Sequence, residues 1–347
     1  MKALVLNAYG GVEHLAVTDV PVPRLEHPDQ VLLRIHRASL NHLDLWVLRG
    51  LPGVEHEFPH IMLGDGAGVV ERVGEAVTEF AVGDRVMINP GVSCYRCEMC
   101  LAGQHSLCST YRLFGEHLPG SAAEFMVVPA HNCAPVPPDM GWDQAAAFSL
   151  VTLTAWRMLT SRGRLAPGET VLIWGIGGGV AQAALQIAKL IGARAIVTSS
   201  SNDKLERAAT LGADIGLNHE EVDVAKEVRR LTGKRGVDLV VDNVGESTWQ
   251  NSLRCLRPSG RLVTCGGTTG PMVTTDIRRL FWFQYDIMGS TMGSYQEYQA
   301  ITRLAGRGKL WPVVDSVFPL HDGPAAFARL QEADHFGKVV IDISGED

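Results

Sequence analysis

The sequence of 347 residues contains no lysine- or arginine-rich run, and its formal net charge is −7. Nucleic acids and anionic membrane surfaces attract proteins through basic patches, so neither is expected as a partner. The sequence also lacks internal repeats and low-complexity tracts, which excludes repeat architectures. Hydrophobic residues make up 46% and charged residues 20%, as in ordinary globular proteins, and the length suits two domains.

No signal peptide or membrane span is recognised either. The N-terminal stretch MKALVLNAYGG has one lysine and no small-residue cleavage site, so a strand is predicted there. The most apolar stretch, residues 171–192, contains closely spaced glycines, two glutamines and a lysine. This composition favours a buried strand, turn and helix over a membrane span. We therefore expect a cytoplasmic protein, in which thiols stay reduced.

Four of the seven cysteines fall within one short stretch, CYRCEMCLAGQHSLC. Under reducing conditions such a cluster indicates a metal site rather than disulfides. Four thiolates fill a tetrahedral zinc site and leave no open position, so the predicted zinc is structural, one per chain, and holds a lobe over residues 91–112. The predicted ligands are Cys94, Cys97, Cys100 and Cys108.

Two sequence patterns divide the chain. Up to about residue 135, short β-like runs alternate with Gly and Pro, which predicts a mostly antiparallel, partly barrel-like domain. From about residue 170, strands alternate with helices, which predicts a parallel, doubly wound sheet. The C-terminal part ends in another strand, GKVVIDIS, which we assign to the first domain. The predicted fold class is α/β, with a mostly β domain of residues 1–148 and 293–347 and a dinucleotide-binding domain of residues 149–292.

A glycine-rich turn lies between an apolar strand and an apolar helix, in VLIWGIGGGVAQAALQIAK. Glycines there let a pyrophosphate approach bare backbone N–H groups, and the helix N-terminus adds partial positive charge. The strict G-x-G-x-x-G spacing is broken, because Val180 and Ala181 stand where the last glycine would fall. The predicted cofactor contacts are Gly175, Gly177, Gly178, Gly179 and Val180.

The end of the next strand selects the cofactor. NAD sites place an acidic residue there, whereas this sequence has Ser199, Ser200 and Ser201, followed by Lys204. Hydroxyls and a lysine can donate to a ribose 2′-phosphate, so NADP(H) is favoured over NAD(H). Asp203 is expected to cap a helix that begins at Lys204. Further candidates for cofactor binding are Thr154, Asn243, Gly266 and Gly267.

The chain resembles the medium-chain dehydrogenase/reductase superfamily over nearly its full length. The resemblance rests on NHLDLWVLRG, LGDGAGVVERVG, the four-cysteine lobe, SLVTLTAW, VLIWGIGGGV and the closing GKVVI. It looks closest to zinc-lobe-bearing members that are alcohol dehydrogenase-like or quinone oxidoreductase-like. The resemblance implies a GroES-like catalytic domain, a Rossmann domain, an active site in the cleft between them, and a homodimer or homotetramer.

The resemblance also implies that a catalytic zinc is missing. Zinc-dependent relatives hold it with a Cys, a His and a second Cys or acid, and Asn41, Asp65 and Leu150 fall at those positions. One good donor among three does not hold zinc. Leu43 stands where relatives keep a hydroxyl for proton relay. Asn41, His42 and Asp65 are the catalytic candidates, and His42 is implied near the cofactor pyrophosphate, as a proton donor or a structural histidine.

Three functions stay open at this point. The first is an NADPH-dependent oxidoreductase for a small carbonyl, enone or quinone, in which Asn41 and His42 hydrogen-bond the developing oxyanion. The second is an alcohol dehydrogenase whose catalytic zinc has atypical ligands. The third is a non-enzymatic protein that only binds NADP. The sequence does not name the substrate, because side chains on several loops build its pocket.

Overall fold

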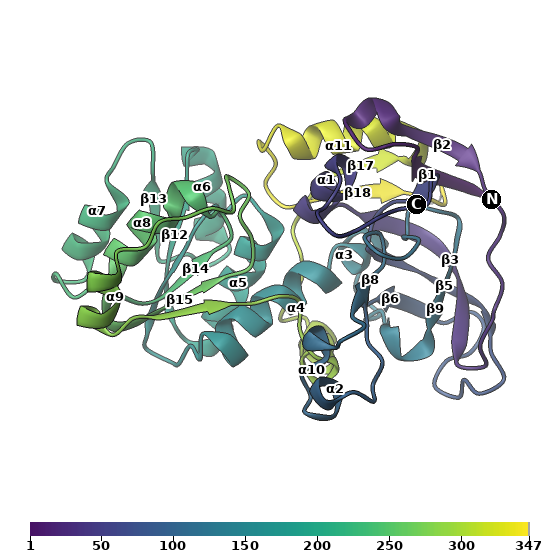
Figure 1. The fold of residues 1–347 in the computed structure, drawn as a ribbon, viewed down its shortest axis with the longest axis horizontal. Helices are drawn as coiled ribbons and strands as arrows, with labels where there is room; N and C mark the ends of the chain where they lie inside the picture. The colour runs from purple at the N-terminus through teal and green to yellow at the C-terminus, as the bar shows by residue number, and fades with distance from the viewer. Residues whose placement is uncertain (346–347) are drawn as a thin grey trace. The chain divides into compact units, whose positions relative to one another are not determined.

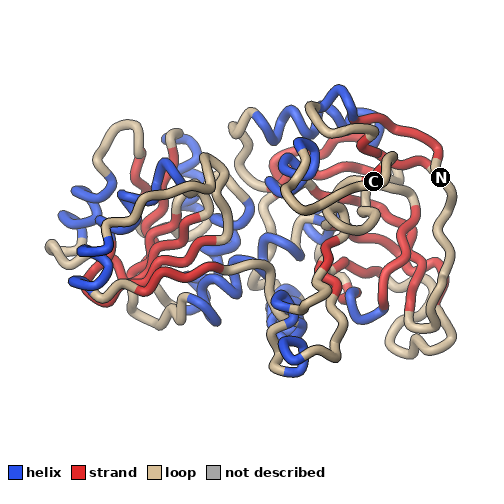
Figure 2. Tube along the Cα trace, viewed as in Figure 1, coloured by secondary structure: helices blue, strands red, loops and turns tan. Residues whose placement is uncertain are grey.

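The computed structural model describes residues 1–345, which form two compact units (Figures 1 and 2). The first unit contains Met1–Val151 and the segment from Ser294 onward, and the second contains Thr152–Gly293. Each unit has its own hydrophobic core. No helix among the described residues is long and apolar enough to cross a membrane.

A seven-stranded sheet forms the centre of the first unit, in the order β10-β6-β5-β3-β18-β17, with β9 paired along another part of β3. Its pairs are antiparallel except for β17 and β18, which run parallel. β3 (QVLLRIHRAS) is long, and most of its residues are buried, as expected for a strand that is paired on both sides. The strands are β3 (Gln30–Ser39), β5 (Asp65–Val73), β6 (Arg85–Ile88), β9 (Phe125–Pro129), β10 (Cys133–Pro135), β17 (Val314–Pro319) and β18 (Lys338–Asp342).

Two small sheets and several short helices complete this unit. β1 (Lys2–Leu6) pairs with β2 (Leu15–Asp19) and β4 (His60–Ile61), and β7 (Gly91–Val92) pairs with β8 (Arg112–Leu113). The helices are α1 (His42–Arg49), α2 (Glu98–Leu101), α3 (Trp142–Ala146), α10 (Tyr295–Ala305) and α11 (Gly323–Gln331), and 3-10 turns occur at Val12–His14, His105–Leu107, Ala130–Asn132 and Leu320–Asp322.

The second unit is a six-stranded, fully parallel sheet in the order β13-β12-β11-β14-β15-β16, flanked by helices (Figure 2). The order reverses at β11, so ligands are expected where the carboxyl ends of β11 and β14 diverge. The strands are β11 (Thr170–Ile173), β12 (Arg194–Ser199), β13 (Ile215–Asn218), β14 (Val237–Asp242), β15 (Leu256–Thr264) and β16 (Asp286–Gly289). The helices are α5 (Gly179–Ile191), α6 (Asn202–Thr210), α7 (Val224–Leu231), α8 (Glu246–Cys255) and α9 (Ile277–Phe283), after α4 (Ser149–Arg157) and a π-helical turn at Met158–Arg162.

The predicted combination of a mostly antiparallel β domain with a doubly wound parallel sheet is confirmed. One local prediction is wrong. The helix expected to begin at Lys204 begins at Asn202, and its N-cap is Ser201, whose hydroxyl accepts from the Lys204 backbone N–H at 3.4 Å. Asp203 therefore lies in the first turn of the helix and does not cap it. Its negative charge there interacts favourably with the helix dipole.

Candidate active site and metal centre

Three distant segments of the first unit meet beside the end of β3. Ser39, the last residue of β3, pairs with Asp65, the first residue of β5. On the other side of β3, β18 runs antiparallel, and its first residue is Lys338. Both neighbouring strands therefore begin where β3 ends, and the chain continues from there to Asn41, just before α1. The sheet register places these three polar side chains together.

Asn41, Asp65 and Lys338 form a closed polar network, which we call the Asn–Asp–Lys network. The Asn41 Nδ2 atom donates to Asp65 Oδ2 at 2.9 Å. The Lys338 ammonium donates to Asn41 Oδ1 at 2.5 Å and lies 3.4 Å from Asp65 Oδ2. The backbone N–H of Leu150 donates to the other carboxylate oxygen, Asp65 Oδ1, at 2.9 Å. No member of the network is more than 5% exposed, so protein groups take the place of water around this carboxylate.

Burial controls the electrostatics of the network. It raises the pKa of Asp65, which the Lys338 charge and the hydrogen bonds from Asn41 and Leu150 lower again in part. Burial likewise lowers the pKa of Lys338, opposed by the charge of Asp65. Each charge therefore depends on the other, and removing one would leave the second buried without a counter-charge.

Asp44 joins this region from the first turn of α1. Its Oδ2 atom accepts from the Asn41 backbone N–H at 2.6 Å, as part of a capping box. Burial raises the pKa of Asp44 to about 7, although that hydrogen bond and the charge of Lys338 lower it. The charges of Asp65 and Glu116 raise it further. The Asp44 carboxyl is therefore a buried group that titrates near neutral pH.

The Asn–Asp–Lys network does not fit a catalytic zinc. Such a site needs three protein donors and an open position. The side chain of Leu150 has no donor atom, the amide oxygen of Asn41 accepts from an ammonium, and both oxygens of Asp65 accept hydrogen bonds. The ammonium of Lys338 supplies a positive charge within the network.

The four cysteines do fit a metal. Their sulfur atoms all lie within 4.8 Å of one another, and within residues 1–345 they are the only group of three or more His, Cys, Asp or Glu arranged to share an ion. Zn–S bonds of about 2.3 Å in a tetrahedron put sulfur atoms roughly 3.8 Å apart. Backbone N–H groups of Cys97 and Cys94 point at Cys94 Sγ and Cys108 Sγ, each at 3.3 Å. Such donors stabilise thiolate charge, so this cluster suits a closed four-thiolate zinc site.

His42 lies at the start of α1 and is exposed. Its ring packs edge-on against Trp46, with 5.5 Å between ring centres. The surrounding protein and then the charge of Arg49 lower the pKa of His42, so the neutral ring is favoured. No hydrogen bond in the described part of the chain joins it to the Asn–Asp–Lys network. Its role as a proton donor stays a prediction.

The glycine turn of the second unit leaves its backbone accessible. Gly175 has φ +67°, a conformation that glycine adopts readily, and its N–H donates to Thr198 Oγ1 at 3.2 Å. Gly178 is the N-cap of α5, and a Cβ added there would meet no atom closer than 3.7 Å. The first N–H groups of a helix have no acceptor within it. Those near Gly179 and Val180 therefore suit a phosphate, as the sequence predicts, and Gly177 lies in the same turn.

The three serines at the end of β12 differ in burial and in their hydrogen bonds. Ser199 is buried, and its hydroxyl accepts from the Ser201 N–H at 3.1 Å while keeping its own hydrogen to donate. Ser200 is exposed. Ser201 is occupied as the helix cap, and Lys204 is buried. Ser199 and Ser200 thus remain the better donors for a ribose or its phosphate.

The fold also brings an unpredicted carboxylate to this place. Glu221 Oε1 accepts from Asn202 Nδ2 at 2.9 Å and from Asn218 Nδ2 at 3.0 Å. It lies beside the start of α6 because β13 pairs in parallel with β12, which sets Asn218 opposite Ser199. No local sequence motif indicates that Glu221 lies here. Its position follows only from the pairing of β12 with β13.

The remaining cofactor candidates follow β14 and β15 or lie on α4. The Asn243 Oδ1 atom is buried without a hydrogen-bond partner, which suits a ligand donor. Gly267 needs to be glycine, because a Cβ would lie 2.9 Å from the Gly270 carbonyl oxygen. Gly266 precedes it in the same loop. Thr154 is buried, and its hydroxyl donates to the Met292 sulfur at 3.7 Å.

Two family models match the chain. One is described as the alcohol dehydrogenase GroES-like domain and covers residues 27–138. The other is described as zinc-binding dehydrogenase and covers residues 179–307. The two matches fall mainly on the β-rich unit and on the parallel-sheet unit respectively.

Similar proteins cover almost the whole chain. A zinc-type alcohol dehydrogenase-like protein of Schizosaccharomyces pombe is 31% identical over 99% of this chain and 99% of its own. A crotonyl-CoA carboxylase/reductase of Cereibacter sphaeroides is 31% identical over 88% of this chain and 78% of its own. A crystal structure of an NAD-dependent alcohol dehydrogenase superposes with a TM-score of 0.95, at 44% identity over 99% of this chain and all of that one.

Proposed function

Since the chain belongs to the medium-chain dehydrogenase/reductase superfamily, as a zinc-type alcohol dehydrogenase-like member, we propose that it reduces activated carbonyl or enone compounds without a catalytic zinc. Membership makes it an NAD(P)-dependent oxidoreductase that acts on small molecules. One observation supports the finer proposal: the Lys338 ammonium donates to Asn41 and lies 3.4 Å from Asp65, two of the three positions at which the resemblance implies ligands of a catalytic zinc.

The proposed chemistry follows from the donors that the network leaves unused. When bound, a reduced nicotinamide supplies a hydride to an electron-poor carbon. Negative charge then develops on the acceptor's oxygen. One N–H of Asn41 and one of Lys338 are not used within the network, and both can donate to that oxygen. The exposed ring of His42 is the proposed proton donor.

The same donors suit alcohol oxidation poorly. A catalytic zinc promotes alkoxide formation near neutral pH by binding the alcohol oxygen, and the network offers no position for such a metal. The relative described as a crotonyl-CoA carboxylase/reductase also supports an enone-type substrate, because crotonyl-CoA is an α,β-unsaturated thioester.

For the cofactor we propose NADP(H). Ser199 and Ser200 stand where an acidic residue would repel a 2′-phosphate, while the Glu221 carboxylate, bonded to Asn202, opposes this preference. Titration of the parent with NADPH and NADH tests the proposal, and equal dissociation constants would refute it. Ser199→Asp should shift the preference toward NADH and Glu221→Gln toward NADPH, each by about tenfold, the effect of roughly 1.4 kcal/mol of charge interaction.

For the metal we propose one structural zinc at the four cysteines, and for the assembly a homodimer or homotetramer. The decisive experiment combines a zinc count with a substrate panel. We expect one zinc per chain, together with faster reduction of quinones and enones than oxidation of simple alcohols. The neighbour described as an alcohol dehydrogenase supports the competing function. Two zinc ions per chain and ethanol oxidation at ordinary enzymatic rates would establish that function instead.

A further inference from the structure

The second unit has a cavity of about 590 Å³ that none of the proposed chemistry uses. α7, α8, α9 and the turn before β14 line it. That turn and the C-terminal end of α8 lead into the amino ends of β14 and β15. The predicted cofactor contacts follow the carboxyl ends of the strands of this sheet. The cavity therefore lies at the opposite, amino ends of the strands.

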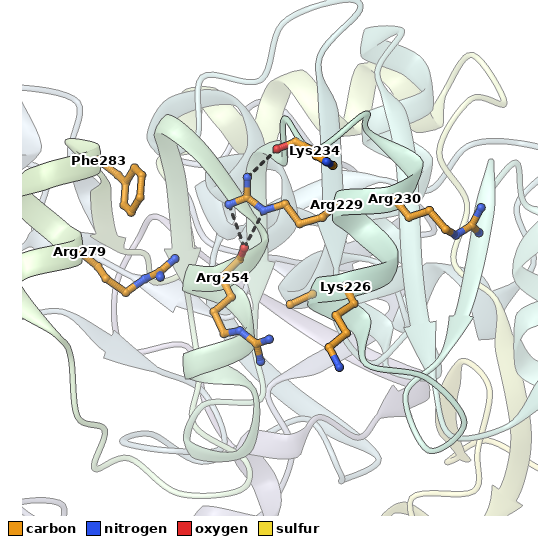
Figure 3. A pocket seen from close by; sticks show the side chains of 8 residues that line it. Lys226, Arg229, Arg230, Lys234, Arg254, Arg279 and Phe283 are labelled. Atoms are coloured by element: carbon orange, nitrogen blue, oxygen red, sulfur yellow. Dashed lines mark hydrogen bonds between the residues drawn. The ribbon is translucent and has the colours of Figure 1, made fainter.

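The cavity is strongly basic. Six of its eight lining residues carry positive charge, whereas the whole chain has a net charge of −7. The six are Lys226, Arg229, Arg230, Lys234, Arg254 and Arg279 (Figure 3). Like charges within one cavity repel one another. The presence of six basic side chains around this cavity therefore needs an explanation, either structural or through binding of an anion.

Two of the six have a structural explanation. Arg229 donates to the backbone carbonyl oxygens of Arg254, Leu256 and Lys234, which ties the end of α8 to the turn before β14. Figure 3 shows its bonds to the oxygens of Arg254 and Lys234. Arg230 pairs with Glu227 at 2.8 Å, and in the same view its side chain points away from the others. Neither guanidinium needs a ligand.

The other four are under-compensated. Lys226 and Arg254 share one carboxylate, that of Asp223, at 3.8 and 3.4 Å. Arg279 lies 5.3 Å from the centre of the Phe283 ring, and its Nε atom is buried without a hydrogen-bond partner. Lys234 is exposed on the turn, and no carboxylate of the described residues forms an ion pair with it. In Figure 3 the Arg279 guanidinium points from α9 toward the side of the cavity that holds Arg229 and Arg254.

We propose that this cavity binds a small organic or inorganic polyphosphate, independently of the dinucleotide cofactor. Guanidinium groups donate two parallel hydrogen bonds to a phosphate, and lysines add charge at its edge. The buried Nε of Arg279 supplies a donor whose desolvation is otherwise uncompensated. The volume is within the range of small-molecule sites, and an anion of several charges best matches the four under-compensated cations.

The test uses the full chain saturated with its preferred dinucleotide, so that the cofactor site is blocked. Pyrophosphate is titrated by calorimetry at low ionic strength, with citrate as a phosphate-free polyanion. The variants are Arg279→Gln and Lys234→Asn, since asparagine tolerates the positive φ of +68° at residue 234. The matched control is Arg278→Gln on the same helix, whose side chain is 85% exposed and paired with Asp276 outside the cavity.

We expect saturable pyrophosphate binding that weakens about tenfold in each cavity variant and less than twofold in the control, the size expected for one charged hydrogen bond. Dinucleotide affinity should not change in any variant. Absence of saturable binding, or equal weakening in the control, would overturn the site. Citrate binding as tight as pyrophosphate would overturn its assignment to phosphate. Lys234→Asn alters an exposed turn, so it decides the matter even where Arg279→Gln fails to fold.

Discussion

The four-cysteine cluster and the Asn–Asp–Lys network belong to the same unit, and each gathers polar atoms around a small volume. In the cluster, four soft sulfur donors face one another, and no cationic side chain of residues 1–345 forms a hydrogen bond with them. In the network, each oxygen already accepts a hydrogen bond and an ammonium supplies the positive charge. The comparison teaches that the cysteine cluster keeps its donor atoms available for an exchangeable ion, whereas the network balances its carboxylate with a fixed side-chain charge.

Removing a ligand from the cluster should have the largest effect. Cys100→Ser replaces a buried thiolate and should lower zinc content from one per chain toward zero, with a clear fall in melting temperature. The reason is that structural zinc contributes binding free energies of about 10–16 kcal/mol in small domains. Metal analysis and thermal unfolding measure both effects.

The matched control is Cys265→Ser, because Cys265 lies outside the cluster and should keep one zinc per chain. If Cys100→Ser kept its zinc, or lost hydride transfer while it stayed folded and bound cofactor, the structural assignment would be wrong.

The network can also be converted, which sharpens the comparison. Asn41→Cys, Asp65→His and Leu150→Cys together restore three zinc donors, and Lys338→Met removes the competing ammonium. The fourfold variant should bind a second zinc. The triple variant that keeps Lys338 should bind less, because a cation repels a cation in a buried site. A fourfold variant that stays at one zinc would show that the ammonium is not what excludes the metal.

Breaking the ion pair should have the next largest effect. Lys338→Met leaves the Asp65 carboxylate buried and without a counter-charge, which should lower the free energy of unfolding by about 3–5 kcal/mol. Adding Asp65→Asn should recover part of the loss, because the unpaired charge is gone. Denaturant unfolding of both single variants and the double variant measures the coupling. Additive losses would mean that the two groups do not stabilise each other.

Local pattern was enough to predict the parallel sheet, the glycine turn and the cysteine cluster. In each of them the residues that act together are close in sequence, as in the spacing from Cys94 to Cys108 or the glycines after β11. The fold class follows from the same periodicities, since alternating strands and helices of this length rarely form another architecture.

Lys338 could not be found in this way. It is the first residue of an apolar strand in GKVVI, where a lysine is normally expected at an exposed strand end. The contact with Asn41 spans 297 residues and exists only because β18 pairs with β3. Glu221 could not be found for the same reason. The pairing of β12 with β13 sets Asn218 opposite Ser199, and that pairing brings Glu221 close to the end of β12. Non-local pairing, not side-chain chemistry, limited the prediction.

The smallest expected effect concerns Asp44, which adjoins the network without being its counter-ion. Its pKa is about 7 in the folded protein and 3.8 as its ordinary value. Between these values the folded state holds a proton that the unfolded state has lost, so stability from this group falls as pH rises through the window. The slope is at most about 1.4 kcal/mol per pH unit, the value for one proton.

Asp44→Asn keeps an oxygen that can accept from the Asn41 N–H but removes the titration. The variant should therefore gain stability relative to the parent as pH rises from 4 to 7. The control is Asp19→Asn, since Asp19 is exposed and bonded to Lys2 at the surface, and it should leave the parent's slope almost unchanged. Denaturant midpoints at four or five pH values measure the difference. A stability difference between Asp44→Asn and the parent that stays constant across the window would mean that the Asp44 carboxyl is ionised throughout. The charge of Lys338, which favours the ionised form, would then outweigh the burial of Asp44.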